Sequence, residues 1–287
     1  MCRFLLIMDH RSVLTDARLR DVASKMLEVP GVAAVMLGGS RARGAEMPDS
    51  DVDLGLYYRP PLDVARLRVL AGTVAGPRTG SGPPELTEPG TWGPWVDGGG
   101  WLTIDGVAVD WIYRDLNRVH RSWELAAAGV FSFHFQVGHP FGVPDFAYAG
   151  EVALGVLLAD SAGELTRLKD QMTTYPPKLA QAIVDRLSEA EFMLEALPKS
   201  AQRRDVTFVA GCLFRVVGLC AHALHAKASR WVISEKGLID AAGKLPQAPV
   251  EFAQRAHEVL GTLGTEPDDL LTAIASAKAL LADTAAS

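Results

Sequence analysis

The sequence predicts a mixed α/β (α+β) domain followed by an all-helical domain. Patterns of buried strands and amphipathic helices alternate through the first half of the 287 residues. From Ala147 onward the strand signals fade and helical periods dominate. A cluster of Gly and Pro over 138–144 separates the two patterns. We therefore expect a first domain over residues 1–140 and a second over residues 141–287.

The elements of the first domain follow from apolar patterning. The run from Val32 to Leu37 is continuously apolar and includes β-branched residues, which is typical of a buried strand. Asp105-Gly106 is a strong hairpin dipeptide between two apolar arms. The expected elements are helices over 16–27 and 62–74, strands over 32–37 and 51–58, and a β-hairpin over 101–113.

Helical periods define the second domain. The expected helices cover 147–159, 164–172, 178–196, 206–226, 249–263 and 267–282. The run from Phe208 to Ala226 is long and apolar, but Arg215 lies inside it and would cost about 2.5 to 3.5 kcal/mol at a bilayer centre. We therefore predict a buried helix and no membrane partner. On this helix, His222 and His225 are interpreted as packing residues.

A glycine turn follows the first predicted strand. Gly38 and Gly39 can adopt backbone angles closed to other residues and allow a ligand to approach the main chain. Ser40 can cap a short helix whose free N–H groups attract phosphate. No Gly-Lys-Ser or Gly-Lys-Thr follows, which excludes a Walker A loop. The turn is predicted to bind the phosphates of a nucleotide.

Two acids open the next predicted strand. Side chains alternate between faces, so Asp51 and Asp53 project from the same face, with α-carbons roughly 6.6 Å apart. Two carboxylates at ~5 Å repel by about 3 kcal/mol at an effective dielectric constant near 20. A divalent cation removes that conflict, and oxygen-only ligands suit Mg²⁺ or Mn²⁺ better than Zn²⁺. The alternative is that Asp51 belongs to a turn and Asp53 to an exposed strand face.

A third acid is expected on a neighbouring strand. Asp110 is the sole charge within the second arm of the predicted hairpin, and an acid in an apolar strand needs a partner. A metal shared by Asp51, Asp53 and Asp110 would supply one.

These residues resemble the signature of the nucleotidyltransferase superfamily, which includes DNA polymerase beta and the aminoglycoside adenylyltransferases. Gly39-Ser40, Asp51-x-Asp53 and the later Asp110 match that signature in type, order and spacing, over roughly the first 115 residues. The resemblance implies that Asp51 and Asp53 bind two Mg²⁺ ions and that Asp110 binds one and helps to activate the acceptor. It also implies that Ser40 contacts the phosphates of ATP or another nucleoside triphosphate. Two metals about 3.5 to 4 Å apart would stabilise the attacking and leaving oxygens.

Further site residues are open to two interpretations each. Arg41 and Arg43 either grip the triphosphate or form a solvated surface pair. Glu88 or Glu85 is a candidate base for the acceptor proton, as a glutamate is in the aminoglycoside enzymes, although no motif aligns either one. Lys236 either reaches the triphosphate, by similarity to a lysine in the helical domain of related adenylyltransferases, or is a surface lysine.

The long segment 76–100 contains two further candidate residues, Trp92 and Trp95. These side chains either stack on a base, wall the acceptor pocket, or cover the sheet edge.

Composition restricts the partners. The net charge of −6 argues against a general nucleic-acid binder. Cys212 and Cys220 would lie about 12 Å apart on a helix, too far for a disulfide, which fits a reducing cytoplasm. Oligomeric state is left open.

The sequence predicts an Mg²⁺-dependent nucleotidyltransferase that moves a nucleoside monophosphate, AMP from ATP, to a hydroxyl of a small acceptor. The helical domain would close the active-site cleft, by analogy with the aminoglycoside enzymes. An antibiotic is the concrete expectation for the acceptor. The alternatives are AMP transfer to a protein, nucleotide transfer to RNA as in toxin-antitoxin relatives, or a noncatalytic nucleotide sensor.

Overall fold

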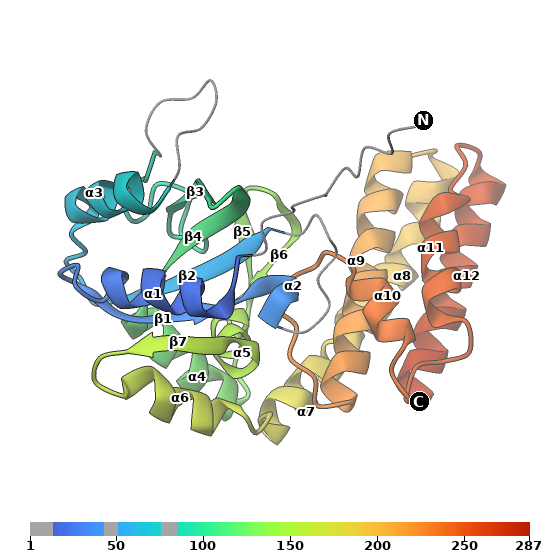
Figure 1. Cartoon of the computed structure of the whole chain (residues 1–287). Coiled ribbons are helices and arrows are strands. Elements are labelled where there is room, and N and C mark those ends of the chain that lie inside the picture. The colour runs from blue at the N-terminus through green and yellow to red at the C-terminus, as the bar shows by residue number, and fades with distance from the viewer. Residues whose placement is uncertain (1–13, 43–50, 76–84) are drawn as a thin grey trace, which may run out of the picture. The chain divides into compact units, whose positions relative to one another are not determined.

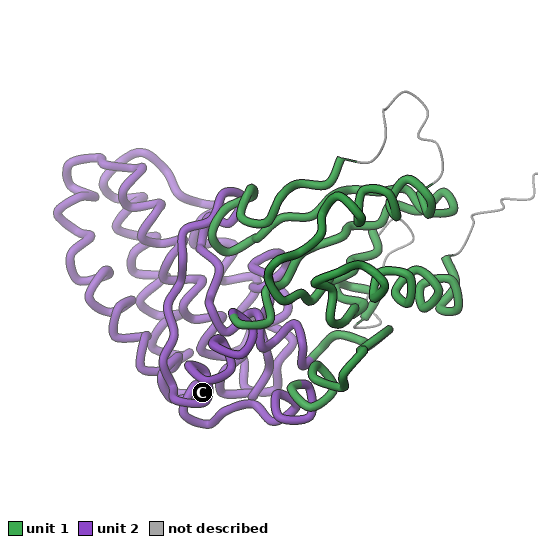
Figure 2. Tube along the Cα trace, turned by 90° about the vertical axis from the view of Figure 1, so that its left-hand side faces the viewer, with its two compact units in different colours: residues 1–117, 154–168 green, residues 118–153, 169–287 purple. Residues whose placement is uncertain are grey.

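The computed structural model describes residues 14–42, 51–75 and 85–287. The chain divides into two compact units, and each is discontinuous in sequence (Figure 2). Unit 1 contains residues 1–117 and 154–168, and unit 2 contains residues 118–153 and 169–287. The predicted division at residue 140 into a catalytic and a helical domain stays a prediction, because compact units and functional domains need not share boundaries.

Unit 1 is built on a five-stranded sheet with the order β3-β4-β2-β1-β7. Its strands are β1 (Val32–Leu37), β2 (Val52–Tyr58), β3 (Gly99–Ile104), β4 (Val107–Asp115) and β7 (Val156–Asp160). The central pair β2 and β4 is parallel, whereas the pairs β1–β2, β1–β7 and β3–β4 are antiparallel. The mixed sheet that the alternating pattern predicts is therefore present.

Helices α1 (Asp16–Met26) and α3 (Val64–Val74) share one hydrophobic core with one face of this sheet (Figure 1). Both helices begin at side-chain caps, since Thr15 accepts from the backbone N–H of Arg18 and Asp63 accepts from that of Arg66. Side chains that form the core include Leu19, Val22, Met26, Leu67, Ala71, Val35, Leu54, Leu56, Val109 and Trp111. Because strand side chains alternate, the residues between these on β2 and β4 belong to the opposite face.

Strand β7 was not expected. The predicted helix over 147–159 ends early, as α5 (Ala147–Leu154), and the chain then returns to pair β7 with β1. The sequence of β7, Val-Leu-Leu-Ala-Asp, is a short apolar run that periodicity alone cannot separate from a buried helix. Pairing with β1 decides between the two, because it satisfies the backbone hydrogen bonds of β7.

Unit 2 is helical apart from a small hairpin, so the expected helical C-terminal region is confirmed. The hairpin joins β5 (Phe133–Gln136) to β6 (His139–Pro144), at the Gly and Pro cluster. Its helices are α5, α7 (Pro177–Asp185), α8 (Leu187–Gln202), α9 (Val206–Lys227), α10 (Leu238–Gly243), α11 (Phe252–Gly261) and α12 (Pro267–Ala286). Helices α4 (Leu116–Ala128) and α6 (Glu164–Met172) have residues in both units, and the last residue of α5 belongs to unit 1. The predicted helix over 178–196 is in fact two helices, which meet at Arg186.

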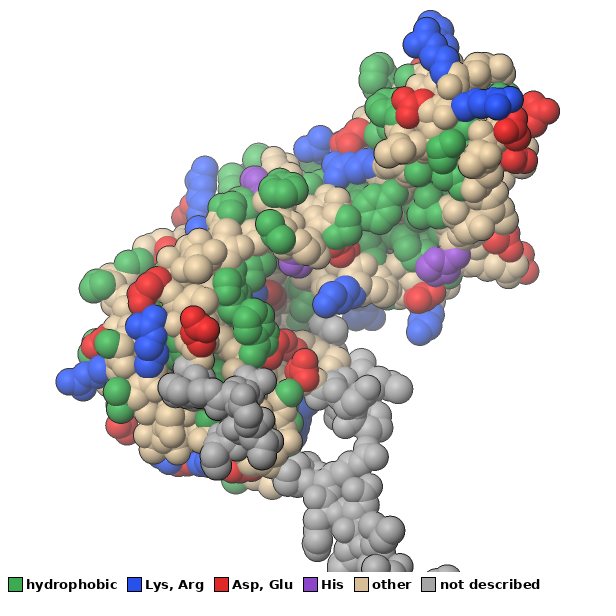
Figure 3. Space-filling model, turned by 90° about the horizontal axis from the view of Figure 1, so that it is seen from above, with side chains coloured by type: hydrophobic (Ala, Val, Ile, Leu, Met, Phe, Trp, Pro, Cys, Tyr) green, Lys and Arg blue, Asp and Glu red, His purple; other side chains and the backbone are tan. Residues whose placement is uncertain are grey.

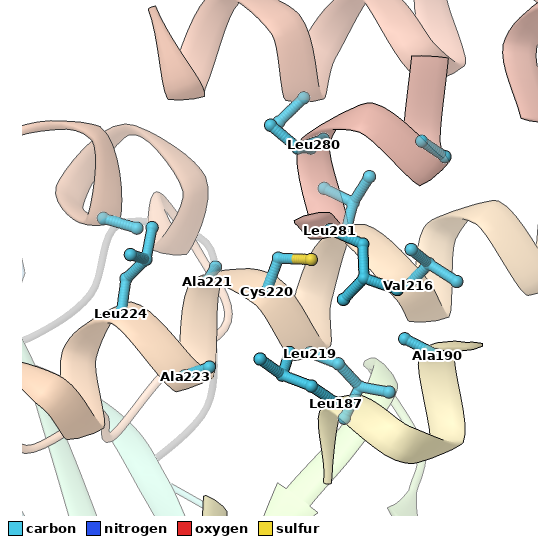
Figure 4. Packing of buried hydrophobic residues seen from close by; sticks show 14 of the residues in the cluster. Leu187, Ala190, Val216, Leu219, Cys220, Ala221, Ala223, Leu224, Leu280 and Leu281 are labelled. Atoms are coloured by element: carbon cyan, nitrogen blue, oxygen red, sulfur yellow. The ribbon is translucent and has the colours of Figure 1, made fainter. Parts of the chain in front are cut away.

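Helix α9 is the core of unit 2. It packs against α7, α8, α10, α11 and α12, and Figure 4 shows Cys220 and its neighbours facing Leu187 of α8 and Leu281 of α12. By length and composition alone α9 could cross a membrane, but more than half of its apolar window is buried inside the unit. The packing accounts for the apolar sequence. Cys212 and Cys220 are both free thiols, as their spacing predicts.

An aromatic cluster surrounds His222 on α9. The imidazole stacks on Phe141 at 5.2 Å between ring centroids and meets Phe133 edge-on at 5.0 Å. The Arg215 guanidinium lies over the same two rings, 4.5 Å from the centroid of Phe141 and 4.7 Å from that of Phe133. Within the described residues, Nδ1 of His222 has no hydrogen-bond partner. Burial, with smaller contributions from His225 and Arg215, lowers the pKa of His222 to about 3.

This depressed pKa predicts that His222 weakens the protein in acid. The unfolded chain takes up a proton on His222 between about pH 6.5 and 3, whereas the folded chain does not, so stability falls as the pH drops through this range. From pH 7 to pH 5, we expect the free energy of unfolding to fall in both proteins, and to fall by about 2 kcal/mol less in His222→Leu than in wild type. Urea denaturation at both pH values measures this difference. Equal losses in the two proteins would show that His222 is not the group responsible.

Candidate active site

The glycine turn lies between β1 and the short helix α2 (Gly39–Ala42), next to β2. Gly39 has a φ of +63°, and a Cβ at this position would lie 1.7 Å from Oδ2 of Asp53. The backbone N–H of Gly38 donates to the carbonyl oxygen of Asp53 at 2.8 Å. The turn needs glycine at position 39 both for its backbone angle and for the close approach of the Asp53 carboxylate. Ser40 lies within α2 instead of capping it.

Asp53 and Asp110 are direct neighbours across the parallel pair β2–β4. Both lie between core-facing residues of their strands, so both project from the face of the sheet opposite α1 and α3. Asp51 precedes β2 and is exposed. The structure therefore brings together Asp53, Asp110 and the glycine turn, which the sequence placed on separate elements.

The carboxylates interact electrostatically. The pKa of Asp110 is raised from its ordinary 3.8 to about 6, first by burial and then by the negative charges of Asp53 and Asp51. Burial and the two neighbouring carboxylates therefore both oppose ionisation of Asp110.

The raised pKa predicts that ionised Asp110 destabilises the metal-free protein. The cost is absent below about pH 4, where the carboxyl is neutral in both states, and grows as the pH rises through about 6. We expect Asp110→Asn to raise the free energy of unfolding at pH 7 by about 1 to 2 kcal/mol, after allowance for partial solvent exposure. Urea denaturation of the two proteins at pH 7 and pH 4.5 tests this. A variant no more stable than wild type at pH 7 would show that ionised Asp110 does not destabilise the folded protein.

Oxygen-only donors at this site suit a hard divalent cation, and the mutual repulsion of the acids is what such an ion relieves. Among residues 14–42, 51–75 and 85–287, however, no three side chains of His, Cys, Asp or Glu converge closely enough to hold a metal ion. The expected metal set of Asp51, Asp53 and Asp110 is not preassembled and stays a prediction.

The predicted cationic contacts fall in different places. Arg41 donates from Nη2 to the carbonyl oxygen of Leu14 at 2.5 Å, so at least part of its guanidinium anchors the start of α1. Arg43 lies outside the described residues. Lys236 is exposed in unit 2, where its backbone N–H donates to Ser234. Contact of any of these side chains with a triphosphate remains a prediction.

The structure does not bring Glu88 to the acids. Its carboxylate pairs with Arg68 of α3 at 2.8 Å, and α3 packs on the sheet face opposite Asp53 and Asp110. Arg68 also donates to the carbonyl of Leu86. The ion pair holds Glu88 beside α3 in this structure, and its role as a base stays a prediction. Glu85 is exposed in the same loop.

Trp101 lies next to the acids, and the sequence reasoning did not single it out. It is the direct cross-strand partner of Asp110 on β3, the edge strand, and 59% of its surface is exposed. Trp92 stacks on it at 4.7 Å between ring centroids, so Trp92 covers the sheet edge, as one of its interpretations states. The Asp105-Gly106 turn contained the necessary signal, because a two-residue hairpin fixes which residues of its arms face each other.

Comparisons with known proteins identify the class of enzyme. Residues 17–77 match the family model described as "Nucleotidyltransferase domain". These residues run from α1 to just beyond α3 and include the glycine turn, Asp51 and Asp53, whereas Asp110 lies outside the match. The chain carries a nucleotidyltransferase domain and is an enzyme of that type, which confirms the resemblance to the superfamily. Such a domain takes a nucleoside triphosphate as donor.

A solved structure of a nucleotidyltransferase-like protein from Exiguobacterium sibiricum is similar to this chain. The two share 12% sequence identity, and the alignment covers 93% of this chain and 74% of that chain with a TM-score of 0.45. No curated protein matches the sequence.

Proposed function

We propose that this protein is an Mg²⁺-dependent nucleotidyltransferase that transfers AMP from ATP to a hydroxyl of a small-molecule acceptor. One observation carries the proposal: Asp53 and Asp110 are paired across two parallel strands, next to a glycine turn that holds its backbone against Asp53. This arrangement supports the placement of a triphosphate at the turn beside two carboxylates on one face of the sheet.

In the proposed reaction, an acceptor oxygen forms a bond to the α-phosphorus of ATP while the bond from that phosphorus to the bridging oxygen breaks. Pyrophosphate leaves with the bond's electron pair, and the acceptor hydroxyl loses its proton. Asp53, Asp110 and Asp51 would hold Mg²⁺, which when bound would neutralise the charge of the phosphates and stabilise the attacking and leaving oxygens. Asp110 is the carboxylate proposed to accept the proton, since Glu88 is engaged on the other side of the sheet.

Surface charge favours a small acceptor over nucleic acid. On the face shown in Figure 3, Lys and Arg side chains of the described residues lie scattered among acidic and hydrophobic ones and do not form a continuous basic stripe. The net charge of −6 agrees with this. We propose an aminoglycoside-like or lincosamide-like antibiotic as the acceptor, in a cytoplasmic setting supported by the free thiols of α9.

The test is to incubate the protein with Mg²⁺ and ATP labelled on the α-phosphate. Pooled antibiotics, bulk RNA and cell protein are offered in separate tubes, each beside the Asp53→Asn variant. Label in the antibiotic pool for wild type alone supports the proposal. Label in protein or in RNA would show that the acceptor is of that class and not a small molecule. Binding of Mg·ATP without label transfer in any tube would favour a nucleotide sensor.

A further inference from the structure

Four positions form one row across the sheet of unit 1. The backbone of Gly38 bonds to Asp53, Asp53 lies opposite Asp110, and Asp110 lies opposite Trp101. Directly opposed residues project from the same face, so the carboxylates and the indole of Trp101 share that face. At strand spacings of about 4.8 Å, the α-carbon of Trp101 lies roughly 10 Å from that of Asp53.

Trp92 packs against the exposed indole of Trp101, so the two side chains form one feature of the surface. Single exposed hydrophobic side chains are common on soluble proteins and need no explanation. Here the two indoles are stacked, with an interplanar angle of 24°. The pair, with Trp101 on the edge strand and Trp92 in the preceding loop, presents a π surface next to Asp110.

The loop that carries Trp92 is pinned at both ends. Near its start, the backbone N–H of Thr87 donates to the carbonyl of Gly99 at 2.9 Å, and the N–H of Gly99 donates back to Oγ1 of Thr87 at 3.0 Å. Near its end, the Tyr58 hydroxyl donates to the buried Asp97 carboxylate at 2.5 Å. These anchors hold the loop against the sheet before any ligand binds, which lowers the entropy cost of using Trp92 and Trp101 as a binding surface.

The order of the row separates the two substrates. The glycine turn lies on the β1 side of Asp53, and Trp101 lies on the far side of Asp110, at the β3 edge. If the triphosphate occupies the turn, the attacking oxygen must approach the α-phosphorus opposite the departing pyrophosphate, and in this arrangement that approach comes from the side of Asp110 and β3. The indole pair is therefore on the acceptor side.

We infer that Trp101, backed by Trp92, is a stacking platform that binds the face of an acceptor ring, planar or C–H-bearing, and presents a hydroxyl on or next to that ring to Asp110. This inference rests on the proposed function, and it restricts the acceptor to ring-bearing hydroxyl compounds. Indole faces bind planar or C–H-faced rings by dispersion and by the ring quadrupole. An open-chain polyol has no such face to stack.

The test uses the full chain, loaded with Mg²⁺ and a non-hydrolysable ATP analogue. The ring probe is 4-nitrophenyl β-D-glucoside, and sorbitol in excess serves as the ring-free competitor. Binding is measured by equilibrium dialysis, and the probe is quantified by its nitrophenyl absorbance, so the tryptophan substitutions do not alter the readout. The variants are Trp101→Thr, which keeps a good strand former but removes the ring, and Trp101→Phe, which keeps a ring. Phe192→Ala removes an exposed aromatic side chain of unit 2 as the matched control.

We expect Trp101→Thr to raise the Kd for the probe about tenfold or more, and Trp101→Phe to stay within about threefold of wild type. Phe192→Ala should match wild type, sorbitol should not displace the probe, and the affinity for the ATP analogue should not change. Loss of ATP-analogue affinity in Trp101→Thr, with probe binding intact, would make the platform a nucleobase site and overturn the inference. Absence of probe binding to wild type, or equal binding to all variants, would also overturn it.

These outcomes are separable from those of the proposed function. Probe binding that depends on Trp101, without transfer of label to any acceptor, would retain the ring site and reject the reaction. Transfer to an identified acceptor with an unchanged KM in Trp101→Thr would retain the reaction and reject the ring site.

Discussion

Replacing Asp53 by Asn is expected to lower turnover by at least about 100-fold while the fold is retained. Asp53 is the point where the elements of the site meet: its backbone carbonyl accepts from Gly38, its carboxylate lies against Gly39, and its strand partner is Asp110. Asparagine has the same shape, but it removes the charge that the site offers to a cation. Without metal, the variant should be at least as stable as wild type, because it lacks the Asp53 charge that helps to raise the pKa of Asp110.

Label transfer from α-labelled ATP and thermal unfolding without metal measure the two effects. Asp16→Asn is the matched control, since Asp16 is an exposed acid in the first turn of α1, and it should keep wild-type turnover. Wild-type turnover in Asp53→Asn would sink the assignment of the site. A loss of turnover accompanied by unfolding would leave the charge argument unsupported, so circular dichroism of the variant accompanies the assay.

Substitution of Gly39 by Ala is expected to reduce turnover by about 100-fold, because a new Cβ would lie 1.7 Å from Oδ2 of Asp53 and must displace that carboxylate. The φ of +63° adds a conformational cost of about 1 to 3 kcal/mol to the folded state. The two effects have one cause, since the turn is built around a residue without a side chain.

Gly38→Ala separates this cause from a general intolerance of the turn. A Cβ at position 38 would meet Asp53 atoms at 3.7 and 3.8 Å, which is ordinary van der Waals contact. We expect its free energy of unfolding to stay within about 0.5 kcal/mol of wild type. Urea denaturation and label transfer on both variants measure the contrast. Equal behaviour of the two variants would show that contact with Asp53 does not set the requirement at position 39.

Local chemistry explains which parts of the site could be predicted. The apolar run before Gly38 and the Asp105-Gly106 turn are properties of short segments, and they appear in the structure as a strand and a hairpin. Asp51 lies just before β2, so its predicted common face with Asp53 stays a prediction. The hairpin even fixed the pairing of Trp101 with Asp110, because both residues of its turn have positive φ and the arms therefore begin to pair at once. That pairing could have been counted from the sequence.

The position of Glu88 could not be predicted from local patterns. It lies in a long loop close in sequence to the hairpin, which made it a candidate base, but nothing in the sequence tells which side of the sheet the loop follows. The ion pair with Arg68 of α3 decides this and draws Glu88 to the side away from the acids. Loops without periodicity contain no directional signal, so only tertiary contacts place their side chains.

The sequence by itself determined the mixed α/β and helical classes, the glycine turn, and the alternation of Asp53 and Asp110 with the core-facing residues of their strands, because apolar periodicity and glycine conformations act over a few residues. Only the tertiary structure decided that β2 and β4 pair in parallel with Asp53 opposite Asp110, that β7 returns to the sheet, and that burial raises the pKa of Asp110. Parallel pairing joins residues separated by a long crossover, and burial depends on every neighbouring element. Neither can be derived from a local pattern, since both depend on contacts between segments distant in sequence.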